Sequence, residues 1–319
     1  MRRSSLTLIT SDIEPAAAAL AQGKLVAFPT ETVYGLGANA LDERAVASVY
    51  EAKGRPRINP LIVHVAERAD AFRLGVFNGA AHALAEAFWP GPLTLVVPRA
   101  DDCPVSLLAS AGLASLAIRM PSHDLARKLI ATAGVPLVAP SANLSGRVSP
   151  TTAAHVLEGL AGRIDMVLDG GACDLGIEST IVSCLEGRPG LLRLGALARG
   201  RIEDVLGEQL TSPVEEGRPI APGGLASHYA PAAALRLGAL RANEGEALLA
   251  FGPQVPEHSG PMLNLSPAGD VTEAAANLFA MLRELDASGV KTIALMPIPN
   301  DGLGEAINDR LRRAAAPRA

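Results

Sequence analysis

Hydrophobic and polar positions near the start of the chain alternate between helical and strand patterns. Ser11 with Glu14 matches a capping box before an alanine-rich helix that stops at Gly23, and "KLVAF" then has the pattern of a buried strand. Asp42 is expected to cap a second helix, "ERAVASVYEA", which ends near Gly54. The strand "PLIVHV" follows after the loop "KGRPRINP". These segments predict a β-α-β unit with an inserted loop.

Further apolar runs predict a sheet with flanking helices. Strands are expected at "LTLVVP", "ASLAIRMP", "PLVAPS", "DMVLDG" and "STIVSCL", and Ser122 is expected to cap the helix "HDLARKLIATAG". Helices that alternate with strands are typical of an α/β fold with a largely mixed or parallel sheet.

Periodicity disappears between about Gly207 and Pro231, where proline, glycine and polar residues predominate, as in a linker. After it, "EALLAFG", a helix from about Asp270 to Ala287, the strand "VKTIALMPI" and the helix "GEAINDRLRRA" predict a smaller α/β unit. We therefore expect a larger first domain at 1–206, a linker at 207–231 and a smaller C-terminal domain at 232–319.

Composition narrows the class of protein. With 319 residues, 49% hydrophobic and 3% aromatic, the chain is expected to fold as two globular domains. A net charge of −5 disfavours nonspecific binding to nucleic acid. No apolar run is long enough to span a bilayer, so a cytoplasmic protein without membrane contact is expected. Cys103, Cys173 and Cys184 lack the spacing of a zinc site or a disulfide framework.

The stretch "GLGANA" matches a dinucleotide fingerprint, but its surroundings do not. Such a site needs its glycines at the start of the crossover helix, and here the helix begins later, near Asp42. The acidic residue expected about 20 positions further on is also missing, because "KGRPR" lies there. No P-loop is present, so other residues must hold any bound phosphate.

Two polar segments and one arginine in an apolar strand could provide a binding site. Lys53, Arg55 and Arg57 lie in one loop and could bind phosphate oxygens, although a solvated basic loop is the better explanation when the loop is taken alone. "PSANLSGRVSP" places Ser141 and Asn143 directly after an apolar strand, where ligands often bind, or it forms an ordinary turn. Arg119 lies in an apolar strand, and a buried arginine usually needs an anionic partner.

Seven motifs in order resemble the threonylcarbamoyl-AMP synthase family in its long, two-domain form. They are "FPTETVYGLG", "KGRPRINPLIVHV", "LAIRMPSH", "PLVAPSANLSG", "GIESTIV", "LLRLG" and "HYAP". One departure is Gly224, where a methionine is expected, and no basic residue directly precedes His228. The resemblance implies a twisted mixed or parallel α/β sheet with flanking helices and a wide positive cavity. It also implies a smaller, Rossmann-like C-terminal α/β domain joined by a linker.

The resemblance implies a nucleotidyltransferase that joins L-threonine, bicarbonate and ATP, releases pyrophosphate and leaves threonylcarbamoyl-adenylate. Partner proteins, a tRNA threonylcarbamoyltransferase complex, would use the adenylate to modify the adenosine beside the anticodon of certain tRNAs. No stable binding of nucleic acid by this chain is expected. Mg²⁺ would arrive with ATP, and no residue is assigned to a protein-bound metal.

Site residues follow from the resemblance motif by motif. Lys53 and Arg55 would be catalytic and, with seven others, would bind ATP: Asn59, Ser115, Ser141, Asn143, Ser149, Arg193 and Tyr229. Threonine would bind Thr32, His64, Arg119, Ser179 and Thr180, with the glycines of "YGLG" letting the backbone approach the ligand. His64 could instead be an ordinary buried strand histidine. Tyr229 could close a lid over the nucleotide or simply pack between domains.

Two other functions remain open on sequence alone. The catalytic domain resembles a module of hydrogenase-maturation carbamoyltransferases, whose zinc-finger and acylphosphatase companions are absent here. A non-catalytic module that binds RNA or assists ribosome maturation would need a basic surface, whereas this chain is acidic overall.

Overall fold

The computed structural model describes residues 6–212, 220–222 and 228–317. Contacts divide the chain into two compact units. The N-terminal unit contains Met1–Ser145, Pro150–Cys173 and Glu178–Gly224, and the C-terminal unit contains Gly146–Ser149, Asp174–Ile177 and Leu225–Ala319. The predicted division at residues 206 and 231 stays a prediction, because part of 207–231, including Gly224, lies outside the described residues.

The N-terminal unit is built on a ten-stranded mixed sheet in the order β1-β8-β2-β3-β7-β4-β6-β5-β9-β10. Its strands are β1 Leu8–Thr10, β2 Val26–Phe28, β3 Gly35–Asn39, β4 Ile62–His64, β5 Leu93–Pro98, β6 Ser115–Arg119, β7 Leu137–Val138, β8 Met166–Leu168, β9 Thr180–Ser183 and β10 Gly190–Arg193. The sheet contains both parallel pairs, such as β4–β6, and antiparallel pairs, such as β5–β6. The predicted mixed α/β sheet is therefore confirmed.

Seven helices of the described residues flank this sheet: α1 Ile13–Ala21, α2 Glu43–Lys53, α3 Arg68–Leu74, α4 Gly79–Phe88, α5 Asp124–Ala133, α6 Ala153–Leu160 and α7 Arg199–Leu206. Asp42 caps α2 as predicted, with its carboxylate accepting from two backbone amides, and Gly54 ends α2 in a left-handed conformation.

Two predicted caps are wrong. Asp12, one residue after Ser11, caps α1, because its carboxylate accepts the Glu14 amide. The N-cap of α5 is His123 rather than Ser122, and it makes no capping hydrogen bond through its side chain. In both cases the helix begins one residue later than the capping pattern predicted.

The opening motif forms a strand rather than the turn of a dinucleotide site. Val26 to Phe28 pair antiparallel with Gly37 to Gly35, so the chain returns beside β2 and no helix follows the glycines directly. A Cβ on Gly37 would lie 2.8 Å from a ring carbon of Phe28, and one on Gly35 would lie 3.1 Å from the Cβ of Ala139. The missing side chains are thus required by packing inside the protein.

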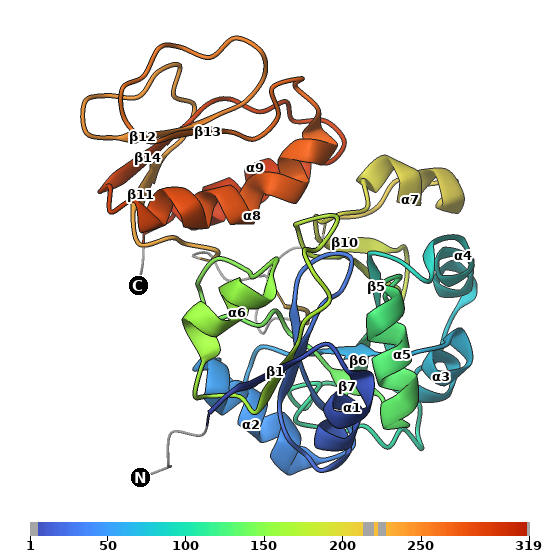
Figure 1. Ribbon diagram of the computed structural model, residues 1–319. Helices are drawn as coiled ribbons and strands as arrows, with labels where there is room; N and C mark the ends of the chain where they lie inside the picture. The colour runs from blue at the N-terminus through green and yellow to red at the C-terminus, as the bar shows by residue number, and fades with distance from the viewer. Residues whose placement is uncertain (1–5, 213–219, 223–227, 318–319) are drawn as a thin grey trace. The chain divides into compact units, whose positions relative to one another are not determined.

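The sheet buries its two faces in different ways. One face packs against α2, α4 and α6 in a large apolar cluster, and part of the other packs against α1 and α5, which lie side by side (Figure 1). The remaining part of this second face carries Ile62, Val96, Ala117 and Ile181, whose apolar cluster includes Ala221 and no residue of a helix. The centre of the sheet therefore has a region without helical cover among the described residues.

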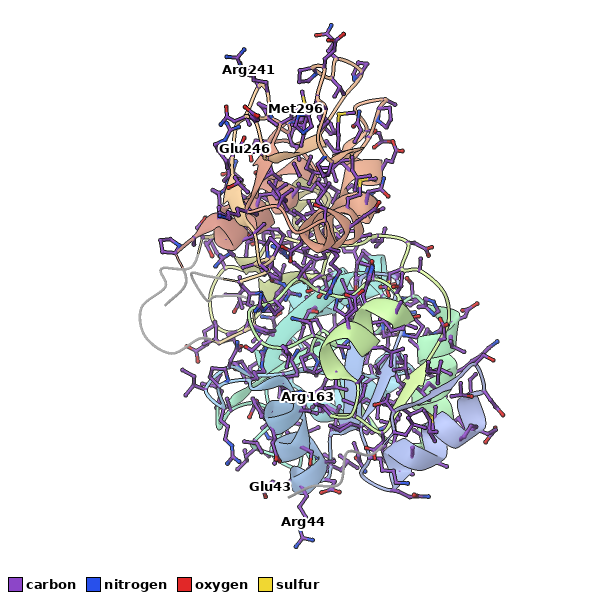
Figure 2. All side chains as sticks on the ribbon, turned by 60° about the vertical axis from the view of Figure 1, so that its left-hand side comes forward. Glu43, Arg44, Arg163, Arg241, Glu246 and Met296 are labelled. Atoms are coloured by element: carbon purple, nitrogen blue, oxygen red, sulfur yellow. The ribbon has the colours of Figure 1, made fainter. Side chains whose placement is uncertain are left out.

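The C-terminal unit is a parallel sheet with two helices. Its order is β11-β14-β12-β13, made of β11 Ala234–Arg236, β12 Ala247–Ala250, β13 Met262–Asn264 and β14 Thr292–Leu295. Helices α8 Val271–Ala287 and α9 Gly304–Ala315 pack against each other and against this sheet (Figure 1). The predicted smaller α/β unit is confirmed. Glu246, labelled in Figure 2, forms an ion pair with Arg236 at the start of this sheet.

None of the helices in the described ranges is long and apolar enough to cross a membrane.

Replacing Gly37 with alanine should destabilise the protein, because the new Cβ would overlap the Phe28 ring and the carbonyl oxygen of Val26. Overpacking of this kind costs about 1–3 kcal/mol of unfolding free energy, which urea titration would measure. Gly79→Ala is the matched control, since a Cβ there meets no atom within 4 Å and alanine favours the helix. Equal stability of Gly37→Ala and the wild type would contradict this packing role.

Candidate active site

Two strands place the predicted ligand residues along one line. Ser115, Ala117 and Arg119 alternate along β6, so their side chains share one face, and Ile62 and His64 of β4 lie opposite Ala117 and Arg119. Four residues of extended chain separate Ser115 from Arg119 by roughly 13 Å. One end of this line is at Arg119 and His64, the last residues of β6 and β4. The other end is at the first residues of the two strands.

Lys53 connects two of the predicted motifs. Its ammonium donates to the carbonyl oxygens of Ser141 and Asn143, the latter at 2.5 Å, and the Ser145 amide donates to the Lys53 carbonyl at 2.9 Å. The side chain is 2% exposed. The last turn of α2 and the loop after β7 are therefore held together, as is necessary if Lys53 and Asn143 bind one ligand.

The charge of Lys53 is poorly stabilised in this environment. Burial, followed by repulsion from the nearby Arg55 guanidinium, lowers the pKa of the Lys53 ammonium well below its usual range. No carboxylate is an ion-pair partner of Lys53 in the described part of the chain. An anion that arrived here would reverse this shift, because an opposite charge favours the ammonium form.

Arg55 and Asn59 shape the loop before β4. The Arg55 guanidinium donates to the carbonyl of Pro60 at 2.9 Å and to that of Asn59 at 3.3 Å. The loop therefore curls around the guanidinium of Arg55. Asn59 is 1% exposed, and its side-chain oxygen has no hydrogen-bond partner among the described residues. A buried polar atom of this kind usually has a partner, so Asn59 is suited to accept from a ligand.

Arg119 is buried at the other end of the line. Its guanidinium contacts Glu31 at 2.7 Å and donates to the Thr32 hydroxyl at 2.9 Å and to the Gly91 carbonyl at 3.3 Å. The anionic partner that the sequence requires for a buried arginine is thus provided by the protein itself, through Glu31.

Glu31 is a residue that the sequence analysis did not assign. Burial raises the pKa of its carboxyl, but the Arg119 charge and hydrogen bonds outweigh burial and hold the pKa below its usual value. Glu31 is therefore ionised at neutral pH. The sequence contained an indication of this role, because Glu31 lies within "PTETVYGLG". A glutamate between two threonines, just before a glycine-containing strand, is not expected in a hydrophobic core.

His64 is neutral and enclosed. It is 2% exposed, its Nδ1 lies 3.2 Å from the Ile62 carbonyl, and its ring meets Phe28 edge-on at 6.4 Å. Burial and then the Arg119 charge lower its pKa to about 3. The contact with Ile62 fits a buried strand histidine, and the position opposite Arg119 fits a ligand contact, so both interpretations stay open.

The "GIESTIV" segment turns its two hydroxyls to different partners. The Ser179 hydroxyl lies 2.8 Å from that of Thr94, a second buried residue that the sequence analysis missed, and Arg193 donates to both the hydroxyl and the carbonyl of Ser179. The Thr180 hydroxyl donates to the Leu197 carbonyl at 2.6 Å and accepts from the Leu197 amide. Its donor and acceptor are thus used inside the protein.

Ser149 and Tyr229 belong to the C-terminal unit. Ser149 is fully buried, and Tyr229 is 2% exposed. The Tyr229 ring stacks on Phe279 at 5.7 Å, and its φ of +63° is a left-handed conformation that non-glycine residues rarely adopt. The Tyr229 ring thus packs within its own unit, and the two predicted roles, a lid over the nucleotide or packing between domains, both stay predictions.

The structure joins the predicted residues into three groups within the N-terminal unit. Lys53 contacts Ser141 and Asn143, Arg119 contacts Thr32 and lies opposite His64, and Arg193 contacts Ser179. Arg55 and Asn59 contact each other within the loop before β4, Ser115 lies at the start of β6, and Ser149 and Tyr229 belong to the other unit.

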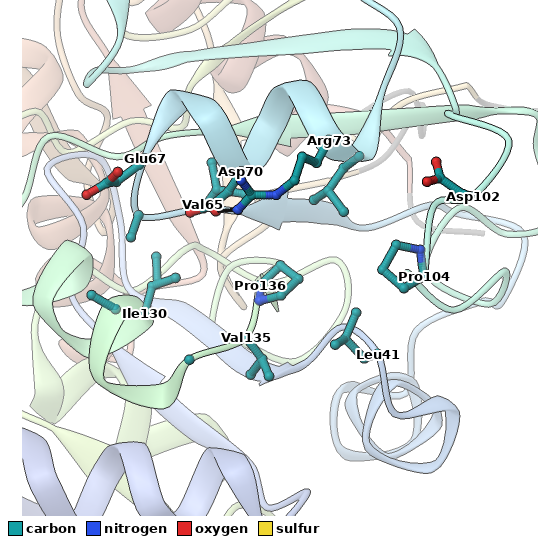
Figure 3. Close-up of a pocket in the computed structure, with 14 residues that line it drawn as sticks. Leu41, Val65, Glu67, Asp70, Arg73, Asp102, Pro104, Ile130, Val135 and Pro136 are labelled. Carbon is teal, nitrogen blue, oxygen red and sulfur yellow. Dashed lines mark hydrogen bonds and ion pairs between the residues drawn. The ribbon is translucent and has the colours of Figure 1, made fainter.

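One pocket of the N-terminal unit does not coincide with these groups. It has a volume of about 600 Å³ and lies between α3 and α5, lined by Val65, Asp70, Arg73, Ile130 and Pro136 among others (Figure 3). None of the predicted site residues lines it. We assign the candidate site from the buried polar contacts instead, because a binding site requires convergent polar groups as well as a cavity.

A metal site is not formed by the protein's own side chains in the described ranges, where no group of three or more His, Cys, Asp or Glu could hold an ion. The groups around Lys53 are cations and carbonyl oxygens, and a cationic environment does not suit a bound divalent ion.

Two family models match the chain. One is described as "Telomere recombination" and covers residues 18–195, and the other is described as "Threonylcarbamoyl-AMP synthase, C-terminal domain" and covers residues 197–316. A threonylcarbamoyl-AMP synthase of Pyrococcus abyssi is 42% identical over 326 residues, covering 95% of this chain and 94% of the relative. One of Bacillus subtilis is 42% identical over 332 residues, covering 98% and 95%.

The same similarity extends to solved structures. A crystal structure of Pyrococcus abyssi Sua5 complexed with L-threonine superposes with a TM-score of 0.88 at 39% identity, covering 97% of each chain. The agreement over both units supports the α/β architecture described above.

Acid should destabilise the protein through His64. The His64 pKa is about 3 when folded against a usual 6.5, so the unfolded chain binds the extra proton within this window and stability falls as pH falls. Between pH 7 and pH 5 this group should cost about 2 kcal/mol of unfolding free energy, measured by urea titration at both values.

His64→Gln should remove that part of the pH dependence, whereas His82→Gln, at an exposed histidine, should retain it. An identical pH dependence in His64→Gln and the wild type would show that His64 is not held neutral.

Proposed function

The chain belongs to the threonylcarbamoyl-AMP synthase family, and from this premise we propose that it joins L-threonine, bicarbonate and ATP into L-threonylcarbamoyladenylate with release of pyrophosphate. The observation that carries the proposal is the line of buried groups on β4 and β6, with the Arg119 group at one end and the Asn59 loop at the other. An elongated adenylate with an amino acid at one end fits a site of that length.

We propose that the residues around Lys53 bind the phosphates. Lys53 and Arg55 would neutralise the charge that develops on the leaving pyrophosphate, and Ser141 and Asn143 would orient it. Because the Lys53 pKa is lowered in the free protein, nucleotide binding would restore its full charge where that charge is needed. Positioning and charge neutralisation are the main requirements of displacement at phosphorus.

Threonine would bind at the Arg119 end. Arg119 and the ionised Glu31 together present a positive and a negative group, the pattern that complements the carboxylate and the ammonium of a free amino acid. Thr32, His64, Ser179 and Thr180 would contact its remaining polar groups. Since the Thr180 hydroxyl is held by Leu197, we expect its contribution to come through the shape of the segment.

The nucleotide's base and sugar would lie toward Asn59 and Ser115, with Ser149, Arg193 and Tyr229 as further contacts. Asn59 is the best supported of these five, because its buried side-chain oxygen lacks a partner in the described part of the protein. We also propose that Tyr229 closes over the nucleotide.

We propose that Mg²⁺ enters as part of the nucleotide substrate. The cationic surroundings of Lys53 do not fit a protein-held ion, so no step is assigned to one. The product would pass to a tRNA threonylcarbamoyltransferase complex in the cytoplasm, and the chemistry is that of a nucleotidyltransferase. The maturation-enzyme alternative loses support, because the C-terminal family model also matches this chain.

Purified protein supplied with ATP, Mg²⁺, bicarbonate and threonine should release pyrophosphate only when all four are present. A coupled pyrophosphate assay with single omissions measures this dependence. Equal release with serine in place of threonine, or without bicarbonate, would count against the proposed reaction.

Substitutions at the two ends should have different kinetic effects. Lys53→Ala should mainly lower kcat and Arg119→Ala should mainly raise the KM for threonine, each by more than about tenfold, because a charged contact contributes about 1.5–3 kcal/mol. Steady-state kinetics at varied threonine and ATP separate the two effects. Lys128→Ala and Arg163→Ala remove exposed cations and serve as controls; Arg163 is labelled in Figure 2.

Arg119→Ala also leaves Glu31 buried without its cation, which destabilises the fold. The double variant Glu31→Gln/Arg119→Gln removes both charges, so it should recover much of the melting temperature while threonine affinity stays low. If the double variant regained normal threonine KM, Arg119 would act only in folding.

A further inference from the structure

Helix α8 contacts three separate segments, each of which leads into a predicted substrate residue. The segments are Asp174–Ile177, the residues around Tyr229, and Gly146–Ser149, and all three belong with α8 to the C-terminal unit. Figure 1 shows α8 as the longest helix of this unit. The first segment precedes Ser179 and Thr180 in the chain, and the third contains Ser149.

The first contact is a close approach of backbones. A Cβ on Gly176 would lie 2.4–2.6 Å from the Ala276 carbonyl oxygen, the Ala275 carbonyl oxygen and the Ala276 Cα. Gly176 also has a φ of +68°, so a side chain is disfavoured twice. The segment before the "ESTIV" motif thus rests directly on the backbone of α8.

The second contact holds Tyr229 in its unusual conformation. Phe279 of α8 stacks on one side of the Tyr229 ring with an interplanar angle of 22°, and the Arg310 guanidinium of α9 lies 4.9 Å from the ring centroid. Arg310 is 1% exposed, so this cation–π contact is desolvated. Packing of this kind can offset the cost of a left-handed φ.

The third contact is a charged hydrogen bond. Arg283 of α8 donates through Nη2 to the carbonyl of Val148, the residue before Ser149. The same segment is also paired with the exit of the linker, because the Ala230 amide donates to the Gly146 carbonyl at 2.9 Å.

The three contacts come from one stripe of the helix. Ala276, Phe279 and Arg283 are spaced three and four residues apart, which places them on the same side of α8. Glu284, the next residue after Arg283, is exposed. The stripe therefore joins the buried face of α8, to which Phe279 belongs, with the half-buried Arg283 beside it.

We propose that this stripe of α8 positions the substrate segments, with Arg283 acting on the nucleotide through Ser149 and the Gly176 contact acting on threonine through Ser179. Neither residue touches the reacting atoms; each is a positioning residue that sets the path of the chain next to a binding residue. The proposal rests on the function proposed above for Ser149 and Ser179.

The test is a split in the Michaelis constants of the full-length protein. Arg283→Ala should raise the KM for ATP by about threefold to tenfold and change the KM for threonine by less than about twofold, because one charged hydrogen bond is lost next to Ser149. Gly176→Ala should do the reverse, since the added Cβ displaces the segment before Ser179. A purely structural loss would instead lower the melting temperature and the active fraction without separating the two constants.

Matched variants isolate each cause. Arg283→Lys retains a donor for the Val148 carbonyl and should recover most of the ATP affinity, and Glu284→Ala should behave as the wild type. Gly187→Ala is the control for Gly176→Ala, because Gly187 has a similar φ of +78° but a Cβ there meets no atom within 4 Å. Equal changes in both constants, or no change in either, would overturn the proposal.

Hydrogen exchange tests the same contacts without relying on activity. Arg283→Ala should speed amide exchange in peptides that cover 146–149 and not in those that cover 174–177, and Gly176→Ala should show the opposite pattern. Failure of the wild type to make the adenylate would refute the proposed function alone. Unchanged exchange in both variants would refute the positioning role whatever the chemistry.

Discussion

Burial of the Arg119 charge is the constraint on which the candidate site depends. A guanidinium inside a protein is stable only when its donors are used and its charge is balanced. Two segments meet this need at Arg119: the turn that carries the Glu31 carboxylate and the Thr32 hydroxyl, and the loop that carries the Gly91 carbonyl. The turn between β2 and β3, the end of β6 and the loop after α4 are thereby fixed against one another, and His64 beside them is kept neutral.

Lys53 shows the complementary situation. Its ammonium is solvated by two backbone carbonyls and has no carboxylate for balance in the described ranges, so the protein leaves it short of negative charge. A site that binds phosphate should have this property, because a cation already neutralised by a carboxylate would gain less from the ligand. The two ends of the site therefore differ in charge balance, which matches a dipolar amino acid at one end and a polyanion at the other.

The sequence by itself determined most of the elements and the family. Hydrophobic periodicity and capping residues located α2 between Asp42 and Gly54, the buried strands and the C-terminal α/β unit. These elements depend on local propensity and capping. Apolar surroundings around Arg119 indicated a buried cation with an anionic partner. The order of seven motifs indicated the family, because each motif is a short local pattern that can be recognised in a single sequence.

Only the tertiary structure decided which residues meet. Glu31 as the partner of Arg119, and Thr94 as the partner of Ser179, join segments 88 and 85 residues apart, and no local pattern specifies such pairs. The packing need for glycine at position 37 likewise depends on the ring of Phe28 in the neighbouring strand. Propensity and capping act over a few residues, whereas these contacts depend on strand order and register, which the whole fold sets.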